Sequence, residues 1–168
     1  NSIILSQFTN PSNPRAHYLN TGKEIYEDLN GVVDVFVSAI GTGGTISGTG
    51  KYLKEKNPKI KIVGVEPASS PLLTKNEIGS HKIQGIGANF IPKTLDRNIY
   101  DNIYDVSDDD AFQYSKEVAL LEGILVGISS GAALEASLIE ALKEENKDKN
   151  IVVIFPDSGF KYLSTELF

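Results

Sequence analysis

Residues 32–45 read VVDVFVSAIGTGGT, an apolar run followed directly by a glycine-rich turn. Val33 to Ile40 predicts a buried strand, and Ile46 to Asn57 predicts a helix that Pro58 ends. Ile60 to Val65 then predicts a second strand. This order indicates two parallel strands joined by a right-handed crossover helix, so the glycine-rich turn should lie at the carboxyl edge of a parallel sheet.

The rest of the chain continues the α/β pattern. Residues 13–29 predict a helix before the first strand. Later in the chain we expect the helix Ala111–Leu121 with Ser107 and Asp108 as capping residues, the strand Ile124–Ile128, a helix capped by Ser129 or Ser130, and the strand Ile151–Phe155. Leu134, Leu138 and Leu142 recur every four residues and predict one apolar helix face. The fold class is therefore α/β, a mostly parallel twisted sheet flanked by helices.

A long segment lies between the two halves of this pattern. Pro67 to Pro92 has no clear periodicity and is long for a plain connector, and such segments are often functional. We expect it to line the site. The chain has 168 residues, 40% of them hydrophobic, which is the size of one domain, and it contains no internal repeat or linker. Residues 1–168 are predicted to form a single α/β domain.

The candidate anion-binding loop consists of Gly41, Thr42, Gly43, Gly44 and Thr45. Glycines let the backbone approach a ligand, amide groups at a helix start point at phosphate oxygens, and threonine hydroxyls add donors. A dinucleotide-binding fingerprint would need glycine at position 46 or 53, where this chain has Ile46 and Leu53. A P-loop would need glycine at position 45 and serine or threonine at position 52, where it has Thr45 and Tyr52. The loop therefore favours a phosphorylated cofactor other than NAD or a nucleoside triphosphate, and a ligand-free turn is the alternative.

Four segments resemble one family of enzymes. They are residues 41–48 (GTGGTISG), 7–17 (QFTNPSNPRAH), 81–92 (HKIQGIGANFIP) and 127–133 (GISSGAA). In order and spacing they are similar to motifs of the fold-type II pyridoxal 5′-phosphate enzymes, specifically cysteine synthases (O-acetylserine sulfhydrylases) and cystathionine β-synthases. The tail PDSGFKYLSTELF, residues 156–168, resembles the closing segment of cysteine synthases. The resemblance runs from end to end of the chain and implies the larger, cofactor-binding domain of such an enzyme, incomplete here.

This resemblance implies a role for each motif. The loop Gly41–Thr45 would bind the cofactor phosphate, and Ser129 would hydrogen-bond the pyridine nitrogen unless it is only a helix cap. Gln7 would contact the substrate carboxylate unless it only bonds to backbone. The residues expected to border the amino-acid pocket are Gln84, Gly85 and Gly87. Asn89 stands where the family commonly has glycine, and asparagine tolerates left-handed backbone angles better than most residues.

The family's catalytic motif has no counterpart in this sequence. In the family, a lysine in an early segment forms the Schiff base with the cofactor, and a Ser/Thr-Gly-Asn-Thr loop holds the substrate carboxylate. Every lysine here, from Lys23 onward, lies outside such a context, so no catalytic residue is predicted within this chain. The chain begins at Asn1 and contains no methionine. We expect it to be the C-terminal portion of a longer enzyme, without the Schiff-base lysine and inactive alone.

Composition limits the partners. Sixteen basic against 22 acidic residues give a formal charge of −6, which disfavours nucleic acid. There is no cysteine for a disulfide or thiolate site and no apolar run typical of a signal peptide or transmembrane helix, so a cytoplasmic location is expected. His17 and His81 have no third metal ligand, and the run Asp108–Asp110 is better explained by the helix dipole, so no metal site is expected.

The reaction that the resemblance implies is β-replacement on O-acetylserine. Acetate leaves and sulfide adds to give L-cysteine, in an enzyme that is usually a homodimer. Three alternatives stay open. Cystathionine β-synthase chemistry would use homocysteine in place of sulfide, although the tail argues against it. The chain could also be a noncatalytic binding module for the C-terminal peptide of serine acetyltransferase, or an inert fragment with an exposed apolar surface.

Overall fold

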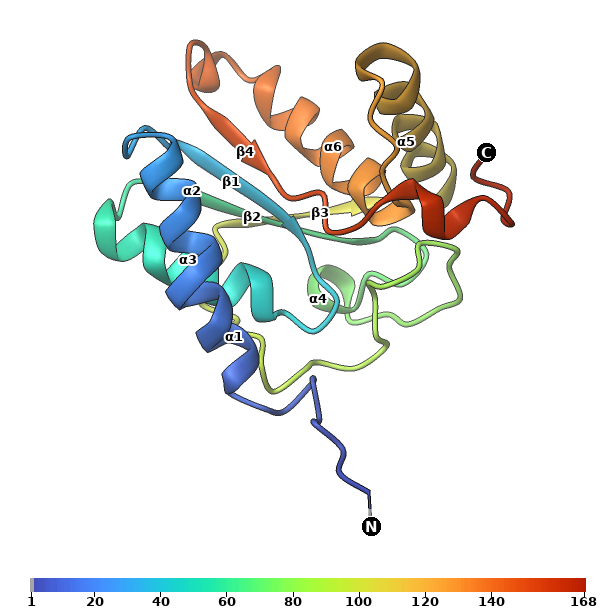
Figure 1. Cartoon of the computed structure of the whole chain (residues 1–168), viewed down its shortest axis with the longest axis horizontal. Helices are drawn as coiled ribbons and strands as arrows, with labels where there is room; N and C mark the ends of the chain where they lie inside the picture. Colours follow the sequence, from blue (N-terminus) through green and yellow to red (C-terminus); the bar gives the residue numbers. More distant parts are fainter. Residues whose placement is uncertain (1) are drawn as a thin grey trace.

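A parallel four-stranded sheet with helices on both faces forms the fold (Figure 1). The computed structural model describes residues 2–168, and the strand order is β3-β2-β1-β4. In chain order the elements are α1 (Ser12–Ala16), the π-helical turn η1 (His17–Thr21), α2 (Gly22–Asp28), β1 (Val35–Ala39), α3 (Gly44–Lys56), β2 (Lys61–Pro67), α4 (Leu72–Lys75), β3 (Asn102–Val106), α5 (Asp108–Glu122), α6 (Ile128–Ala141), the 3₁₀ turn η2 (Glu144–Asn146), β4 (Ile151–Val153) and the 3₁₀ turn η3 (Gly159–Tyr162). The parallel sheet predicted from the sequence is confirmed.

The central strand β1 pairs in parallel with two neighbours. Val37 lies opposite Val63 of β2 and Val153 of β4. Successive side chains of a strand point to opposite faces, and both faces of this strand are covered. Val35 and Val37 pack into one core and Phe36 into the other, and all three are fully buried or nearly so. This explains why the strand reads as a continuous apolar run, as is typical of parallel sheets.

Helices α6 and α5 cover one face of the sheet. α6 packs on β1 and β4, and α5 lies against α6. Ile128, Ala132 and Ala136, spaced four apart on α6, are buried in this core. The predicted stripe lay on another face: Leu138 is 39% and Leu142 87% exposed. The four-residue spacing was predicted correctly, but the buried face is the alanine face and not the leucine face. Small alanines let the helix approach the sheet closely.

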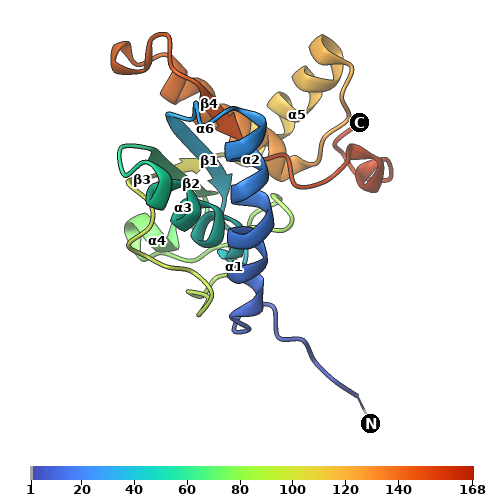
Figure 2. The same ribbon diagram turned by 60° about the vertical axis from the view of Figure 1, so that its left-hand side comes forward.

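The other face is covered by α3, on which the N-terminal helical arm lies (Figure 2). The arm was predicted as one helix over residues 13–29, and it runs from Ser12 to Asp28 with η1 in its middle. Ile46 and Leu53 of α3 are fully buried against the sheet. The core on this face therefore holds the helix that follows the glycine-rich loop in a fixed position.

The predicted strand Ile124–Ile128 is wrong. Only Val126 makes a bridge, antiparallel to Ser158, and Ile128 already belongs to α6. Gly123 ends α5 with a φ of 70°, and Gly127 is the N-cap of α6. Too few residues separate the two helices for a strand to cross the sheet, so α5 and α6 together form the crossover from β3 to β4.

Of the two predicted helix N-caps, one is confirmed and one is wrong. Ser107 caps α5, since its side chain accepts a hydrogen bond from the Asp110 amide, with three acidic residues in the first turn. The prediction that Ser129 or Ser130 caps the next helix is wrong. The N-cap is Gly127, with extended backbone, so both serines lie in the first turn of α6. No helix within residues 2–168 is long and apolar enough to span a bilayer.

Candidate cofactor-binding site

The glycine-rich loop connects β1 to α3 at the carboxyl edge of the sheet, as predicted. Gly43 is the N-cap of α3 and has a left-handed φ of 77°. A Cβ atom there would lie 2.6 Å from the Cβ of Leu95. A Cβ on Gly41 would collide with the carbonyl oxygen of Gly85. Both positions therefore require glycine, because the connector backbone packs directly on the loop.

The loop presents amide groups that have no partner within residues 2–168. The Ser47 amide closes the first turn of α3 on the Gly43 carbonyl, and the Gly44 amide donates to the Thr42 hydroxyl at 3.2 Å. Within residues 2–168, the amides of Thr45 and Ile46 make no hydrogen bond. Free amides at the start of a 13-residue helix, together with the helix dipole, favour an anion such as phosphate.

Hydrogen bonds from the N-terminal helical arm also hold the loop in place. The Asn13 side-chain amide donates at 2.9 Å to both the Thr42 hydroxyl and the Gln7 carbonyl. Thr45 is hydrogen-bonded to His17 Nε2 at 3.3 Å, and burial lowers the pKa of His17, which keeps this imidazole neutral near pH 7. The loop is thus braced by the helical arm before any ligand is present.

Ser129 faces the loop from the first turn of α6. Its side chain is nearly buried, with 4% exposure, and within the described part of the chain its hydroxyl makes no hydrogen bond. The neighbouring Ser130 is fully buried, and its hydroxyl is also without a partner, but it does not reach the cavity. Ser129 is therefore the serine with a hydroxyl available to a ligand.

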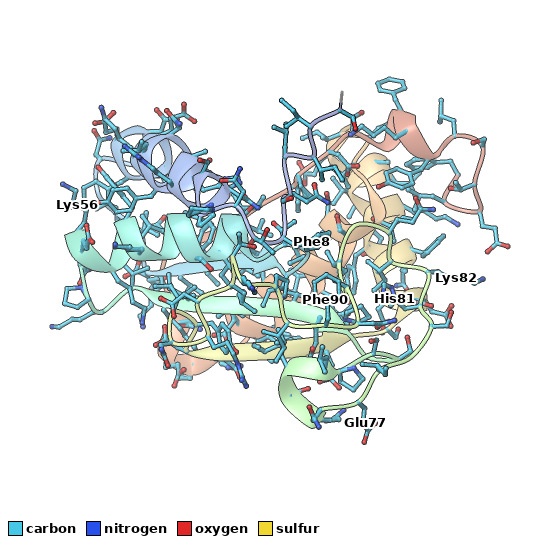
Figure 3. The ribbon with its side chains drawn as sticks, turned by 90° about the horizontal axis from the view of Figure 1, so that it is seen from below. Phe8, Lys56, Glu77, His81, Lys82 and Phe90 are labelled. Atoms are coloured by element: carbon cyan, nitrogen blue, oxygen red, sulfur yellow. The ribbon has the colours of Figure 1, made fainter. Side chains whose placement is uncertain are left out.

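The substrate-side residues come from two distant segments. Gln7 is exposed in a turn whose neighbour Phe8 packs edge-on against Phe90, with ring centroids 5.0 Å apart (Figure 3). Gln84 and Gly85 belong to the connector, which reaches the site as expected. Gly87 lies behind the cavity wall, where its amide donates to the Ile40 carbonyl at 3.2 Å.

A cavity of about 390 Å³ joins these residues. Of the predicted site residues it is lined by Gln7, Gly41, Thr42, Gly43, Thr45, Gln84, Gly85 and Ser129, while Gly44 and Gly87 lie outside the lining. No lysine lines it within residues 2–168, and no group of three or more His, Cys, Asp or Glu in that range could hold a metal ion. The cavity can therefore bind and orient a ligand, but it holds no amine nucleophile.

Sequence reasoning missed several residues of this site. Asp157 and Tyr162 line the cavity, and the Tyr162 hydroxyl donates to Asp157 Oδ2 at 2.9 Å. Burial and this hydrogen bond raise the pKa of Tyr162 to about 12, so the phenol stays protonated at neutral pH. Tyr162 packs in the core while also forming part of the wall. Asn13 and Thr94 were missed because their contacts with Thr42 are distant in sequence.

The fold and the cavity define an α/β protein with an anion-binding loop and a neutral hydroxyl facing it. Residues 1–157 match the family described as "Pyridoxal-phosphate dependent enzyme", and the chain belongs to that family. The site fits this cofactor, because the free amides of the loop suit a phosphate and the unengaged Ser129 hydroxyl suits a ring nitrogen.

Among relatives, cysteine synthase B of Campylobacter jejuni is 52% identical over the whole chain, which covers 55% of that protein. Cysteine synthase of Staphylococcus aureus is 50% identical over 96% of the chain and 52% of its own length. A crystal structure of cysteine synthase (OASS) from Entamoeba histolytica superposes with a TM-score of 0.96 at 46% identity, covering 99% of this chain and 49% of that one.

A hydrogen sulfide-producing enzyme from Fusobacterium nucleatum is 52% identical with a TM-score of 0.92, over 96% of this chain and 55% of that one. The likeness covers the sheet, the connector and the glycine loop together. The chain spans about half the length of the curated relatives it matches.

Proposed function

We propose that this chain is the cofactor-binding portion of a cysteine synthase, which converts O-acetyl-L-serine and hydrogen sulfide into L-cysteine and acetate. The observation that carries the proposal is the convergence of the glycine loop, Ser129 and the Gln84 segment on one cavity. The proposal is supported by two curated cysteine synthases that are at least 50% identical across nearly all of the chain.

Each site residue has a part in this reaction. Bound pyridoxal 5′-phosphate supplies the electron sink that lets the substrate Cα lose its proton. The amides and hydroxyls of Gly41–Thr45 bind the phosphate. Ser129 offers the ring nitrogen a neutral hydroxyl, which does not hold that nitrogen protonated as a carboxylate would. Gln7 holds the substrate carboxylate, and the segment Gln84–Gly87 borders the amino-acid pocket.

The amine that takes the Cα proton lies outside this chain in the proposal. Its support is the absence of any lysine from the cavity lining within residues 2–168. The protein is a fold-type II enzyme that works as a homodimer in the cytoplasm, and its cavity admits the C-terminal peptide of serine acetyltransferase. The family resemblance of the motifs supports these features.

A second candidate activity is release of hydrogen sulfide from cysteine. It is favoured by the 52% identity to the Fusobacterium nucleatum hydrogen sulfide-producing enzyme. The same Cβ–S bond is then broken instead of formed, so the same residues would hold the amino acid. Sulfide release from L-cysteine without any O-acetylserine present distinguishes this activity from synthesis.

Complementation tests the proposal. The purified chain would be mixed with the separately expressed part of Campylobacter jejuni cysteine synthase B that the match does not cover, in the presence of pyridoxal 5′-phosphate. We expect no cysteine from O-acetylserine and sulfide with either part alone and steady formation with both. Steady cysteine formation by this chain alone would refute the proposal that the catalytic amine lies outside it. A complex that forms and binds cofactor but accepts only homocysteine would replace the proposal with cystathionine synthesis.

A further inference from the structure

A second cavity, of about 510 Å³, lies between the N-terminal arm, α3 and residues 93–96. Its apolar wall is formed by Pro11, Pro14, Tyr18, Leu19 and Leu95. The two cavities share no lining residue. Its volume lies in the range of small-molecule sites.

Three cationic side chains from three separate elements line this cavity: Arg15 of α1, Lys51 of α3 and Lys93 of the connector. Within residues 2–168 none of them forms an ion pair, as the salt bridges there involve other lysines. Lys51 Nζ lies 5.5 Å from the centre of the Tyr18 ring. The ring holds a positive charge at the cavity without neutralising it.

Acidic groups do little to balance these cations. Among residues 2–168, Asp96 is the one carboxylate in the lining, and its Oδ1 already accepts a hydrogen bond from the Asn98 amide at 2.9 Å. Glu55 lies outside the lining and accepts a hydrogen bond from the Tyr18 hydroxyl at 2.6 Å. The chain as a whole carries a formal charge of −6, so this excess of positive charge is local. Charged walls around a low-dielectric cavity raise the local concentration of oppositely charged ligands.

We propose that this cavity binds a small organic anion with an apolar body, such as a phosphate ester of an aromatic alcohol. The three cations take the acidic group, and Leu19, Tyr18 and Leu95 cover the apolar part. The hydroxyls on the wall are already engaged: Ser47 accepts from the Asp96 amide at 2.8 Å, and Thr94, Thr9 and Tyr18 donate to the Thr42 carbonyl, the Ser6 carbonyl and the Glu55 carboxylate. Recognition therefore rests on charge and apolar contact, and the site is independent of the proposed cysteine synthesis.

The test is an NMR titration of the purified chain with phenyl phosphate, inorganic phosphate and benzyl alcohol. Methyl signals of Leu19 and Leu95 report the cavity, and the amide signals of Thr45 and Ile46 report the glycine loop. We expect phenyl phosphate to shift the signals of both leucines saturably. It should bind more tightly than inorganic phosphate, which lacks the apolar body, and than benzyl alcohol, which lacks the charged group.

Lys51→Ala and Lys93→Ala should each weaken phenyl phosphate binding by about threefold to tenfold, because each removes one charge-assisted contact. Lys56→Ala is the matched control. Lys56 also lies on α3, at its C-terminal end (Figure 3), with Nζ 5.3 Å from the Tyr52 ring. It does not line the cavity. Its substitution should leave the affinity unchanged.

Three results would overturn the proposal. The first is the absence of saturable shifts at Leu19 and Leu95. The second is equal affinity in Lys51→Ala, Lys93→Ala and Lys56→Ala, which would mean that the cations do not contact the ligand. The third is tighter phenyl phosphate binding read from the Thr45 and Ile46 amides than from Leu19 and Leu95, which would assign the primary site to the glycine loop.

Discussion

The Thr94 hydroxyl donates a 2.6 Å hydrogen bond to the carbonyl oxygen of Thr42, 52 residues earlier in the chain. The Thr94 amide also donates to the Phe8 carbonyl, which belongs to the turn that carries Gln7. Thr94 is 5% exposed, so these bonds are shielded from water. One buried threonine thus links the glycine loop and the substrate-side turn.

Replacing Thr94 by valine keeps the shape of the side chain and removes the donor. We expect Thr94→Val to lower the free energy of unfolding by about 1–2 kcal/mol, since the Thr42 carbonyl loses a partner. Binding of pyridoxine 5′-phosphate should weaken by about tenfold, as expected for a loss of about 1.4 kcal/mol. Urea unfolding and equilibrium dialysis measure the two effects. Thr94→Ser keeps the hydroxyl and should restore both, and wild-type affinity in Thr94→Val would show that the bond does not shape the loop.

Asn89 has a left-handed backbone with φ 59°, as its place in the motif suggested, and its Oδ1 accepts a 2.6 Å hydrogen bond from the buried Ser70 hydroxyl. Asn89→Ala should destabilise the chain by about 2 kcal/mol, because it adds the cost of the left-handed angle to an unpaired buried hydroxyl. Asn76→Ala is the control. Asn76 has φ 57° at the end of α4, so it tests the angle alone and should cost about 1 kcal/mol. Equal losses in urea unfolding would mean that the Ser70 contact contributes nothing.

Glu140 is a buried carboxylate that anchors α6 to the sheet. Burial alone would raise the pKa of Glu140, but hydrogen bonds from Lys143, Tyr104 and Lys61 outweigh it and lower the pKa to about 2 from an ordinary 4.5. A depressed pKa contributes stability above the unfolded value, and this contribution is lost as the pH falls from about 4.5 to about 2.

Glu140→Gln should therefore cost about 2 kcal/mol at pH 7, since it leaves the partly exposed Lys61 and Lys143 without their buried counter-charge. The difference from wild type should shrink toward pH 2, where wild type also becomes protonated. The exposed Glu144→Gln serves as the control and should change little. A penalty for Glu140→Gln that does not vary with pH would contradict this account of the charge network.

The pKa of Glu135 is shifted in the opposite direction to that of Glu140. Burial, followed by repulsion from Asp110, raises the pKa of Glu135 to about 7, and its buried Oε2 has no hydrogen-bond partner among residues 2–168. The folded state then holds a proton that the unfolded state releases, so stability is lost as the pH rises from about 4.5 to about 7. Glu135→Gln should be more stable than wild type by about 1 kcal/mol at pH 8 and equal to it at pH 4. Urea unfolding at the two pH values measures this, and a benefit equal at both would exclude titration of Glu135.

Local sequence patterns predicted the part of the site that is contiguous. The loop Gly41–Thr45 follows a buried strand and precedes a helix, and that order alone places it at the carboxyl edge of the sheet. Ser129 was predicted from the family resemblance of residues 127–133, and the strand expected before it does not form. The helix that carries it begins two residues earlier than a Ser129 cap would allow and three residues earlier than a Ser130 cap would allow.

Features set by distant contacts could not be predicted. The edge strand β3 (Asn102–Val106) was missed because its residues are mostly half-buried and its apolar signal is weak. Thr94 and Asn13 gave no signal, since only the fold brings them to Thr42. The apolar face of α6 was misassigned because spacing alone does not choose between leucines and alanines when both recur every four residues.

The central claim is that the glycine loop and Ser129 together hold pyridoxal 5′-phosphate, and equilibrium dialysis of the chain against pyridoxine 5′-phosphate tests it most directly. This ligand has the same ring and phosphate but no aldehyde, so surface lysines do not trap it. We predict saturable binding by the wild-type chain, affinity weakened by about threefold to tenfold in Ser129→Ala, and unchanged affinity in Ser130→Ala, whose buried hydroxyl does not reach the cavity. Absence of binding, or equal affinity in all three proteins, would contradict the account.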